Sequence, residues 1–248
     1  MPELRICHLY SDLLNLYGDR GNIISMVQRL KRREIGVSVT EVGIGAPLNA
    51  ENFDIFMLGG GQDFAREVLM KDLRSLKAEP IREAVENDKV FLAICFGYQI
   101  MGNYLVDSNG EQSECVGALD IYTEFGEIGR DNRAKRLIGN CLYSSPEFGE
   151  IAAFENHSGL TYLGENVRPL AAIIKGYGNN GKDGTEGARY RNVFATYGHG
   201  PVLPKNPDFC DYILKTAMNK KYPEYYIEQL DNQLEKAAFD YIKAAMMK

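Results

Sequence analysis

Short apolar runs alternate with segments of helical periodicity over the first hundred residues, and this alternation constrains the fold more than any other feature. The apolar runs that read as buried strands cover residues 4–9, 37–42, 53–58 and 90–94. The segments with apolar side chains at helical spacing cover residues 22–33, 64–76 and 80–87. Such alternation is typical of a parallel sheet covered by helices. We therefore predict an α/β fold with a doubly wound, mostly parallel sheet and helices on both faces.

The rest of the chain has a less regular pattern. Residues 116–175 read as short strands with turns. Residues 176–187 are polar and rich in glycine, which predicts an exposed loop. A last strand is expected over 193–197 and a helix over 209–218. The tail from Tyr222 onward is charged and reads as mostly helical.

Length and composition indicate a folded chain with one main core. The 248 residues are 45% hydrophobic and 25% charged, close to globular averages. No internal repeat and no linker interrupts the sequence. We predict one domain over residues 1–220, and a helical tail over 221–248 that packs on the same domain.

Charge and cysteine usage exclude several classes of function. The net charge is −6, and the one basic cluster, Lys31, Arg32 and Arg33, reads as the solvated end of a helix, so nucleic-acid binding is disfavoured. Five widely spaced cysteines and three histidines, with no CxxC pair, favour neither zinc nor disulfides. We expect no metal and no cofactor in this chain. A reduced cytoplasm suits it, since the sequence shows no signal-peptide pattern and no membrane-spanning run.

The strongest local signal is a buried strand that ends at Cys95. Residues 90–102 (VFLAICFGYQIMG) place Cys95 directly after the apolar run and Gly97 two positions later. A cysteine at a sharp turn from strand to helix is the arrangement of a nucleophile elbow. The start of the following helix would favour the thiolate, and the N–H of Phe96 would point at a developing oxyanion. From periodicity alone, a buried core cysteine fits equally well.

Two further features favour a reactive Cys95. Gly59, Gly60 and Gly61 follow a neighbouring strand, and an N–H from this turn would complete an oxyanion hole, which is typically worth ~3 kcal/mol of barrier. His199 follows the last strand, where it could deprotonate Cys95 and later protonate a leaving ammonia. A steric role for the glycines and an idle surface position for the histidine are the alternatives.

These motifs together resemble the class I glutamine amidotransferases and, within them, the cobyric-acid-synthase-type branch. The resemblance rests on residues 59–63 (GGGQD), 95–99 (CFGYQ) and 197–201 (YGHGP). More narrowly, the chain is similar to the GatD family, the glutaminase subunits of lipid II isoglutaminyl synthase. The match to that family runs from about residue 4 to 218. Four segments carry it: residues 14–22 (LNLYGDRGN), 154–157 (FENH), 176–180 (GYGNN) and 199–207 (HGPVLPKNP).

The resemblance implies a flavodoxin-like fold and a division of labour between two subunits. This chain would hydrolyse L-glutamine and pass ammonia to MurT, a Mur-ligase-like partner in a heterodimer. The partner would bind ATP and Mg²⁺ and convert a D-glutamate of lipid II to D-isoglutamine. Ammonia is mostly ammonium at neutral pH and then a poor nucleophile, so a sheltered route between subunits makes chemical sense.

Carried over by position, the resemblance assigns roles to six residues. Cys95 is the nucleophile and His199 the base, and the N–H groups of Gly60 and Phe96 are the oxyanion donors. Arg136 falls where the family has an arginine that holds glutamine, and a guanidinium can bind the substrate carboxylate with two hydrogen bonds. Gln99, one helical turn past the nucleophile, is a candidate substrate contact, or else a helix residue facing solvent.

The third member of the usual triad is absent from its expected place. Many class I enzymes have glutamate two residues after the catalytic histidine, whereas this chain has Pro201. Asp19 is the first candidate to orient His199, because its loop follows the first strand at the same sheet edge, and Glu155 is the second. Either residue could instead be a turn or cap residue.

Two other functions are compatible with such a fold. One is a cysteine peptidase or deglycase of the same fold, which would cleave peptides without binding glutamine. The other is a non-catalytic binding module, in which Cys95 would fail to react with a glutamine-like electrophile. The joint presence of Cys95 and His199 argues against the binding module.

Overall fold

The computed structural model describes residues 1–61, 66–125 and 136–247, and its core is a six-stranded sheet with the order β13-β14-β4-β3-β1-β2. The strand bounds are Glu3–Leu9 for β1, Gly36–Val42 for β2, Ile55–Leu58 for β3, Val90–Ile94 for β4, Ala188–Tyr190 for β13 and Val193–Thr196 for β14. Neighbouring strands pair in parallel except β13 and β14, which are antiparallel. The predicted mostly parallel sheet is therefore confirmed.

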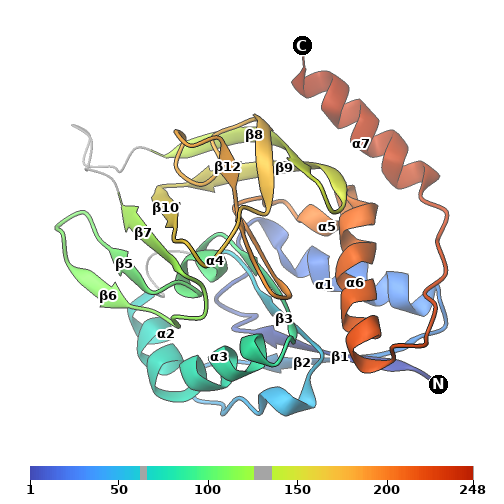
Figure 1. Cartoon of the computed structure of the whole chain (residues 1–248), viewed down its shortest axis with the longest axis horizontal. Coiled ribbons are helices and arrows are strands. Elements are labelled where there is room, and N and C mark those ends of the chain that lie inside the picture. The colour runs from blue at the N-terminus through green and yellow to red at the C-terminus, as the bar shows by residue number, and fades with distance from the viewer. Residues whose placement is uncertain (62–65, 126–135, 248) are drawn as a thin grey trace.

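Helices lie on both sides of this sheet, as predicted (Figure 1). Helix α1 (Arg20–Lys31) and helix α6 (Pro207–Lys221) lie on one side, and α2 (Arg66–Asp72) and α3 (Ala78–Glu86) on the other. The π-helical turn Leu73–Lys77 joins α2 to α3, so the two helices predicted there form one bent unit. Strands β3, β4 and β14 are wholly buried, which explains why they read as continuous apolar runs.

Two smaller sheets are inserted before β13. The first has the order β10-β7-β5-β6, with bounds Gly159–Leu163, Ile121–Phe125, Tyr104–Val106 and Gln112–Glu114. The second has the order β12-β11-β8-β9, with bounds Thr185–Glu186, Ala171–Lys175, Leu137–Ser145 and Gly149–His157. The strands predicted in the middle of the chain are present, although β8 and β9 have nine residues each and are not short.

The exposed loop predicted over 176–187 is wrong in part. Gly178, Asn179, Asn180 and Glu186 are buried, and the Asn179 side chain is hydrogen-bonded within the segment. The Asn179 side chain donates to the Gly187 carbonyl at 2.9 Å and accepts from the Gly187 N–H at 2.8 Å. A polar side chain that is satisfied within its own loop can enter the interior without an unpaired group.

The C-terminal segment is helical only in its second half. Residues 222–232 form no helix, and α7 spans Gln233–Met246, so the prediction of a mostly helical tail is wrong for the first part. Helix α7 packs Met246 against Leu142 and Ala152 of the second small sheet, whereas Leu234 is 86% exposed. The division of the chain at residue 220 stays a prediction.

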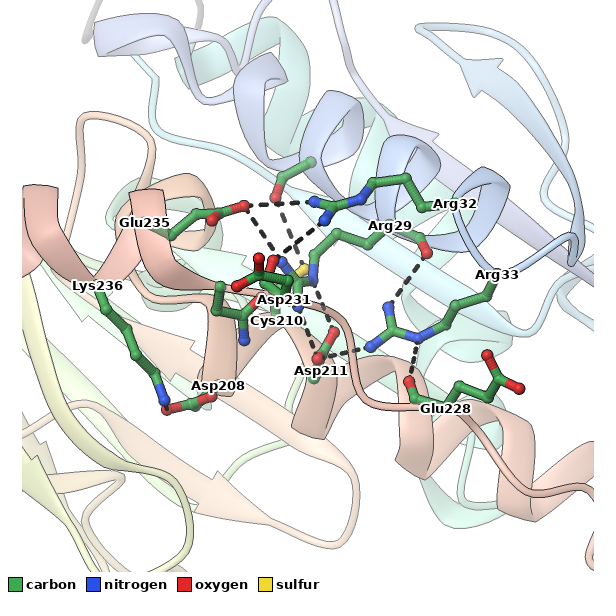
Figure 2. A network of polar contacts seen from close by, with 12 residues as sticks. Arg29, Arg32, Arg33, Asp208, Cys210, Asp211, Glu228, Asp231, Glu235 and Lys236 are labelled. Atoms are coloured by element: carbon green, nitrogen blue, oxygen red, sulfur yellow. Dashed lines mark hydrogen bonds and ion pairs between the residues drawn. The ribbon is translucent and has the colours of Figure 1, made fainter.

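A buried ionic network attaches the non-helical segment to the main domain (Figure 2). Arg29 of α1 donates to both carboxylate oxygens of Asp211 in α6, each at 2.7 Å, and Arg33 donates to the same carboxylate at 2.7 Å. Arg33 also binds the Glu228 carbonyl at 2.7 Å, and Arg29 binds the Asn232 side chain at 2.9 Å. The solvated helix end that was predicted at residues 31–33 is thus wrong for Arg33, which is buried.

None of the helices in the described ranges is long and apolar enough to cross a membrane.

Candidate active site

Cys95 lies at a strained turn between β4 and the short helix α4 (Phe96–Ile100). Its φ is +51°, a left-handed value that costs a residue other than glycine ~1–3 kcal/mol. Backbone hydrogen bonds hold the turn: the Cys95 N–H donates to the Thr196 carbonyl at 2.8 Å, and the Gly97 N–H donates to the Gly59 carbonyl at 3.1 Å. The elbow predicted from the sequence is therefore present.

Gly97 makes this elbow possible because any side chain there would collide with the Leu58 carbonyl of β3. Helix α4 has five residues, so its macrodipole adds less to thiolate stability than a long helix would. The first-turn N–H groups still lack partners within the helix, and the N–H of Phe96 is one of them. Cys95 is 7% exposed and lines a cavity.

His199 is fully buried in the loop after β14. Its backbone pairs with Phe154 of β9, with the His199 N–H donating to the Phe154 carbonyl at 2.7 Å. The Lys205 ammonium donates to the carbonyls of His199 at 3.2 Å and Gly200 at 2.7 Å. The loop is thus fixed from two sides, which limits the positions that the imidazole can take.

The imidazole of His199 lies close to the Asp19 carboxylate and to Cys95. Its Nδ1 is 3.3 Å from Asp19 Oδ2, a distance typical of an ion pair, but without the geometry of a hydrogen bond. Burial lowers the pKa of His199, but the Cys95 thiolate and the Asp19 carboxylate outweigh burial and raise it from 6.5 to about 10. These surroundings therefore favour the protonated imidazole of His199 at neutral pH.

Asp19 contacts both His199 and the glycine turn after β3. The Gly60 N–H donates to Asp19 Oδ2 at 2.7 Å, and a side chain at position 60 would collide with the His199 ring. In this arrangement the N–H that was predicted to bind an oxyanion binds Asp19, and Gly61 rather than Gly60 lines the cavity. Gln62 and Asp63 of the same motif lie outside the described residues.

Glu155, the second candidate to orient His199, is bound elsewhere. Its carboxylate accepts the N–H of Tyr177 at 2.6 Å, the N–H of Gly178 at 2.9 Å and the hydroxyl of Tyr143 at 3.3 Å. These bonds fix the loop that follows β11. Of the two carboxylates, Asp19 is the one that the structure places next to His199.

The cavity beside Cys95 has a volume of about 440 Å³, enough for an amino acid. It opens where β1, β3, β4 and β14 end, because the carboxyl ends of parallel strands share one edge. Its lining combines apolar and polar side chains: Leu16, Tyr17, Gly61, Cys95, Phe96, Gln99, Phe125, Arg136, His157 and Ser158.

Arg136 and Gln99 both reach this cavity, by different routes. Arg136 is exposed, and its guanidinium donates to the Asn156 side chain at 2.6 Å and to the Asn156 carbonyl at 2.8 Å. These two bonds hold the guanidinium at the cavity wall. Gln99 is 4% exposed and donates to the Tyr197 hydroxyl at 3.0 Å, so it does not face solvent.

Tyr17 and His157 are two of the lining residues for which the sequence predicted no role. Tyr17 packs edge-on against His199, with ring centroids 5.1 Å apart. His157 stacks on Tyr197 at 3.6 Å, and its Nδ1 is 2.7 Å from the Gly159 carbonyl. Burial lowers the pKa of His157 to about 4, so this ring is neutral at pH 7. The segment 154–157 is part of the family resemblance, but no spacing rule connects it with Cys95.

No group of three or more His, Cys, Asp or Glu side chains in the described parts of the chain is arranged to hold a metal ion. All five cysteines are free thiols.

Glu186 of β12 binds the end of β14 and makes stability depend on pH. It is fully buried and accepts from the Thr196 hydroxyl at 2.6 Å and the Tyr197 N–H at 2.7 Å. Burial raises its pKa from 4.5 to about 8. The carboxyl is therefore protonated in the folded chain at pH 7 but ionised in the unfolded chain, so unfolding becomes more favourable as the pH rises from 4.5 to 8.

We expect Glu186→Gln to remove this dependence. The amide keeps both hydrogen bonds and cannot ionise. The free energy of unfolding of the variant, relative to that of the wild type, should therefore rise by about 2–4 kcal/mol when the pH is raised from 5 to 8.5, at ~1.4 kcal/mol per pKa unit. Urea unfolding at the two pH values measures the difference. An equal effect of the substitution at both values would contradict a neutral Glu186.

Comparisons with known proteins show the family of this chain. A family model described as the CobB/CobQ-like glutamine amidotransferase domain matches residues 5–207. Subunit GatD of the lipid II isoglutaminyl synthase (glutamine-hydrolyzing) of Staphylococcus aureus strain N315 is 40% identical over 235 residues, which cover 95% of this chain and 93% of that protein. The same subunit of Streptococcus pneumoniae strain R6 is 37% identical, with 89% and 82% covered.

More distant relatives share the family or the fold. The probable cobyric acid synthase of Methanothermobacter thermautotrophicus is 28% identical and covers 74% of this chain, which matches 39% of that protein. A glutamine amidotransferase structure from Thermotoga maritima has a TM-score of 0.53 at 14% identity, with 98% of this chain and 92% of that chain covered, and this likeness concerns the fold. Since the family model spans most of the sequence and close relatives align over nearly all of it, the chain belongs to the CobB/CobQ-like glutamine amidotransferases.

Proposed function

We propose that this chain is the glutaminase subunit of a lipid II isoglutaminyl synthase. The observation that carries the proposal is the meeting of Cys95, on its elbow, with His199 beside a cavity of amino-acid size. The relatives at 40% and 37% identity are named as subunits of that synthase. Glutamine would lie with its carboxamide at Cys95 and its α-carboxylate at Arg136, which reaches the same cavity.

The reaction would start from the thiolate–imidazolium pair. The Cys95 sulfur attacks the carboxamide carbon, and the negative charge that develops on its oxygen faces the Phe96 N–H. The His199 imidazolium gives its proton to the nitrogen, which leaves as ammonia while a thioester forms. Water then loses a proton to His199 and attacks the thioester, which releases glutamate and restores the pair.

Asp19 would be the positioning residue for His199. Its carboxylate is next to Nδ1 and favours the charged imidazole. The second oxyanion donor, the Gly60 N–H, is bound to Asp19 and must leave it before it can serve the reaction. We therefore expect weak hydrolysis by the isolated chain.

The ammonia would pass to a Mur-ligase-like partner, MurT, in a heterodimer. That partner would use ATP and Mg²⁺ to activate the D-glutamate of lipid II, which ammonia then converts to D-isoglutamine. Support comes from the names of the relatives at 40% and 37% identity, which describe a subunit of a glutamine-hydrolysing synthase. This chain itself would need no cofactor.

A coupled assay tests the proposal. The purified chain is incubated with L-glutamine, alone and together with the Mur-ligase-like protein, ATP, Mg²⁺ and lipid II, and glutamate and amidated lipid II are measured. We expect slow glutamate formation by the chain alone and faster formation, with amidation, in the full mixture. The absence of glutamate in both mixtures would overturn the proposal, and peptide cleavage without glutamine binding would point to the peptidase class.

A further inference from the structure

One carboxylate oxygen of Asp19 lies close to both the Gly60 N–H and the His199 imidazole. Its Oδ2 accepts the Gly60 N–H at 2.7 Å and lies 3.3 Å from His199 Nδ1. Its Oδ1 is buried and has no hydrogen-bond partner among the described residues. The carboxylate is itself fully buried, so solvent does not satisfy the remaining oxygen.

The imidazole next to it is incompletely bonded as well. Within the described ranges, neither Nδ1 nor Nε2 of His199 has a hydrogen-bond partner, although the ring is fully buried. A buried polar atom without a partner costs about 1–3 kcal/mol. A small rotation of the Asp19 carboxylate toward Nδ1 would give the ring the hydrogen bond that it lacks.

The Gly60 N–H cannot serve Asp19 and an oxyanion at the same time. Its present partner keeps it out of the cavity, which is lined by Gly61 instead. The segment before Asp19 is bonded to the same turn, since the Leu16 N–H donates to the Gly60 carbonyl at 3.0 Å. Tyr17, in this segment, has a left-handed φ of +56° and lines the cavity, so a ligand there contacts the element that carries Asp19.

We propose that Asp19 is a two-position switch, which holds the Gly60 N–H in the resting site and transfers to His199 when glutamine occupies the cavity. The carbonyl oxygen of the substrate then takes the Gly60 N–H, and Asp19 forms the hydrogen bond to Nδ1 that the resting site lacks. One exchange of partners thus completes the oxyanion hole and orients the base together. The inference rests on the proposed glutaminase function and adds to it the regulation of the same site.

Two substitutions of Asp19 separate the switch from a simple positioning role. Asp19→Asn keeps an acceptor for the Gly60 N–H but loses the charge, whereas Asp19→Ala loses both. If Asp19 only positioned His199, the conservative asparagine would be the better enzyme, or the two would be equal. The switch predicts the reverse order: the Asp19→Ala variant should hydrolyse glutamine about tenfold faster than the Asp19→Asn variant. In Asp19→Asn, one retained hydrogen bond of ~1.4 kcal/mol still holds the Gly60 N–H.

Iodoacetamide supplies the matched control, because alkylation of Cys95 needs no oxyanion donor. We expect the two variants to be alkylated at equal rates. If the wild type hydrolyses glutamine and the Asp19→Asn variant is as fast as the Asp19→Ala variant or faster, the switch is overturned and the proposed function stays intact. No hydrolysis by the wild type, alone or with its partner, would overturn both.

A structure of the wild-type chain tests the switch without any variant. Glutamate γ-semialdehyde would form a hemithioacetal with Cys95 that imitates the tetrahedral intermediate. The switch predicts that the Gly60 nitrogen leaves Asp19 and approaches the hemithioacetal oxygen, and that Asp19 bonds to Nδ1 of His199. A hemithioacetal that forms while the Gly60–Asp19 hydrogen bond persists would contradict it.

Discussion

Replacing Cys95 by alanine is expected to reduce glutamine hydrolysis by more than about 10⁴-fold, because no other group in the cavity can form the thioester. Replacing His199 by alanine should reduce it by about 10²–10⁴-fold, since the leaving nitrogen then lacks its proton donor. Glutamate release by the wild type and both variants, each mixed with the Mur-ligase-like partner, measures these effects. Wild-type rates in either variant would contradict the assigned roles.

Cys115 offers a matched control for the loss of a thiol. It has the same 7% exposure as Cys95, but it lies outside the cavity lining. Burial raises its pKa to about 12, so it is a thiol at neutral pH. We expect Cys115→Ala to hydrolyse glutamine at the wild-type rate.

Replacing Asp211 by alanine is expected to lower the free energy of unfolding by about 3–5 kcal/mol. The substitution leaves the guanidinium groups of Arg29 and Arg33 buried without their shared carboxylate, and a buried charge without a partner is costly. It also weakens the attachment of the segment 222–232, which the same arginines hold (Figure 2). Urea unfolding at pH 7 measures the change.

An exposed ion pair between α6 and α7 provides the control. Asp208 and Lys236 are each 56% exposed and 3.9 Å apart, so Asp208→Ala should cost about 0–1 kcal/mol. Burial raises the pKa of Asp211, but its arginine partners lower it further, to below 3.8. The stabilisation is therefore complete above that pH and is lost as the pH falls through the folded pKa. Equal losses for Asp208→Ala and Asp211→Ala at pH 7 would contradict the importance of burial.

The main sheet and the meeting of Cys95 with His199 could be predicted because both depend on local patterns. Each parallel strand reads as an apolar run, and parallel strands carry their following loops to one edge. Once β4 and β14 are recognised, the positions of Cys95 and His199 at that edge follow. The comparison with known families confirmed the resemblance that these motifs suggested.

Features that depend on partners distant in the sequence could not be predicted. The segment 222–232 has helical spacing, but Arg33 and Arg32 bind the carbonyls of Glu228 and Asp231, which a helix would use internally. Those arginines directly follow α1, near the other end of the chain. The hydrogen bond from the Gly60 N–H to Asp19 could not be predicted either, since no periodicity relates a carboxylate to an N–H in another loop.

The central claim is that one thiol and one imidazole share a glutamine pocket, and labelling with a diazo-ketone analogue of glutamine tests it most directly. Mass spectrometry of the labelled chain should find one adduct, on Cys95, that excess L-glutamine prevents and that forms more slowly in His199→Ala. An adduct spread over several cysteines, or one that forms on Cys95 at the same rate without His199, would contradict the account.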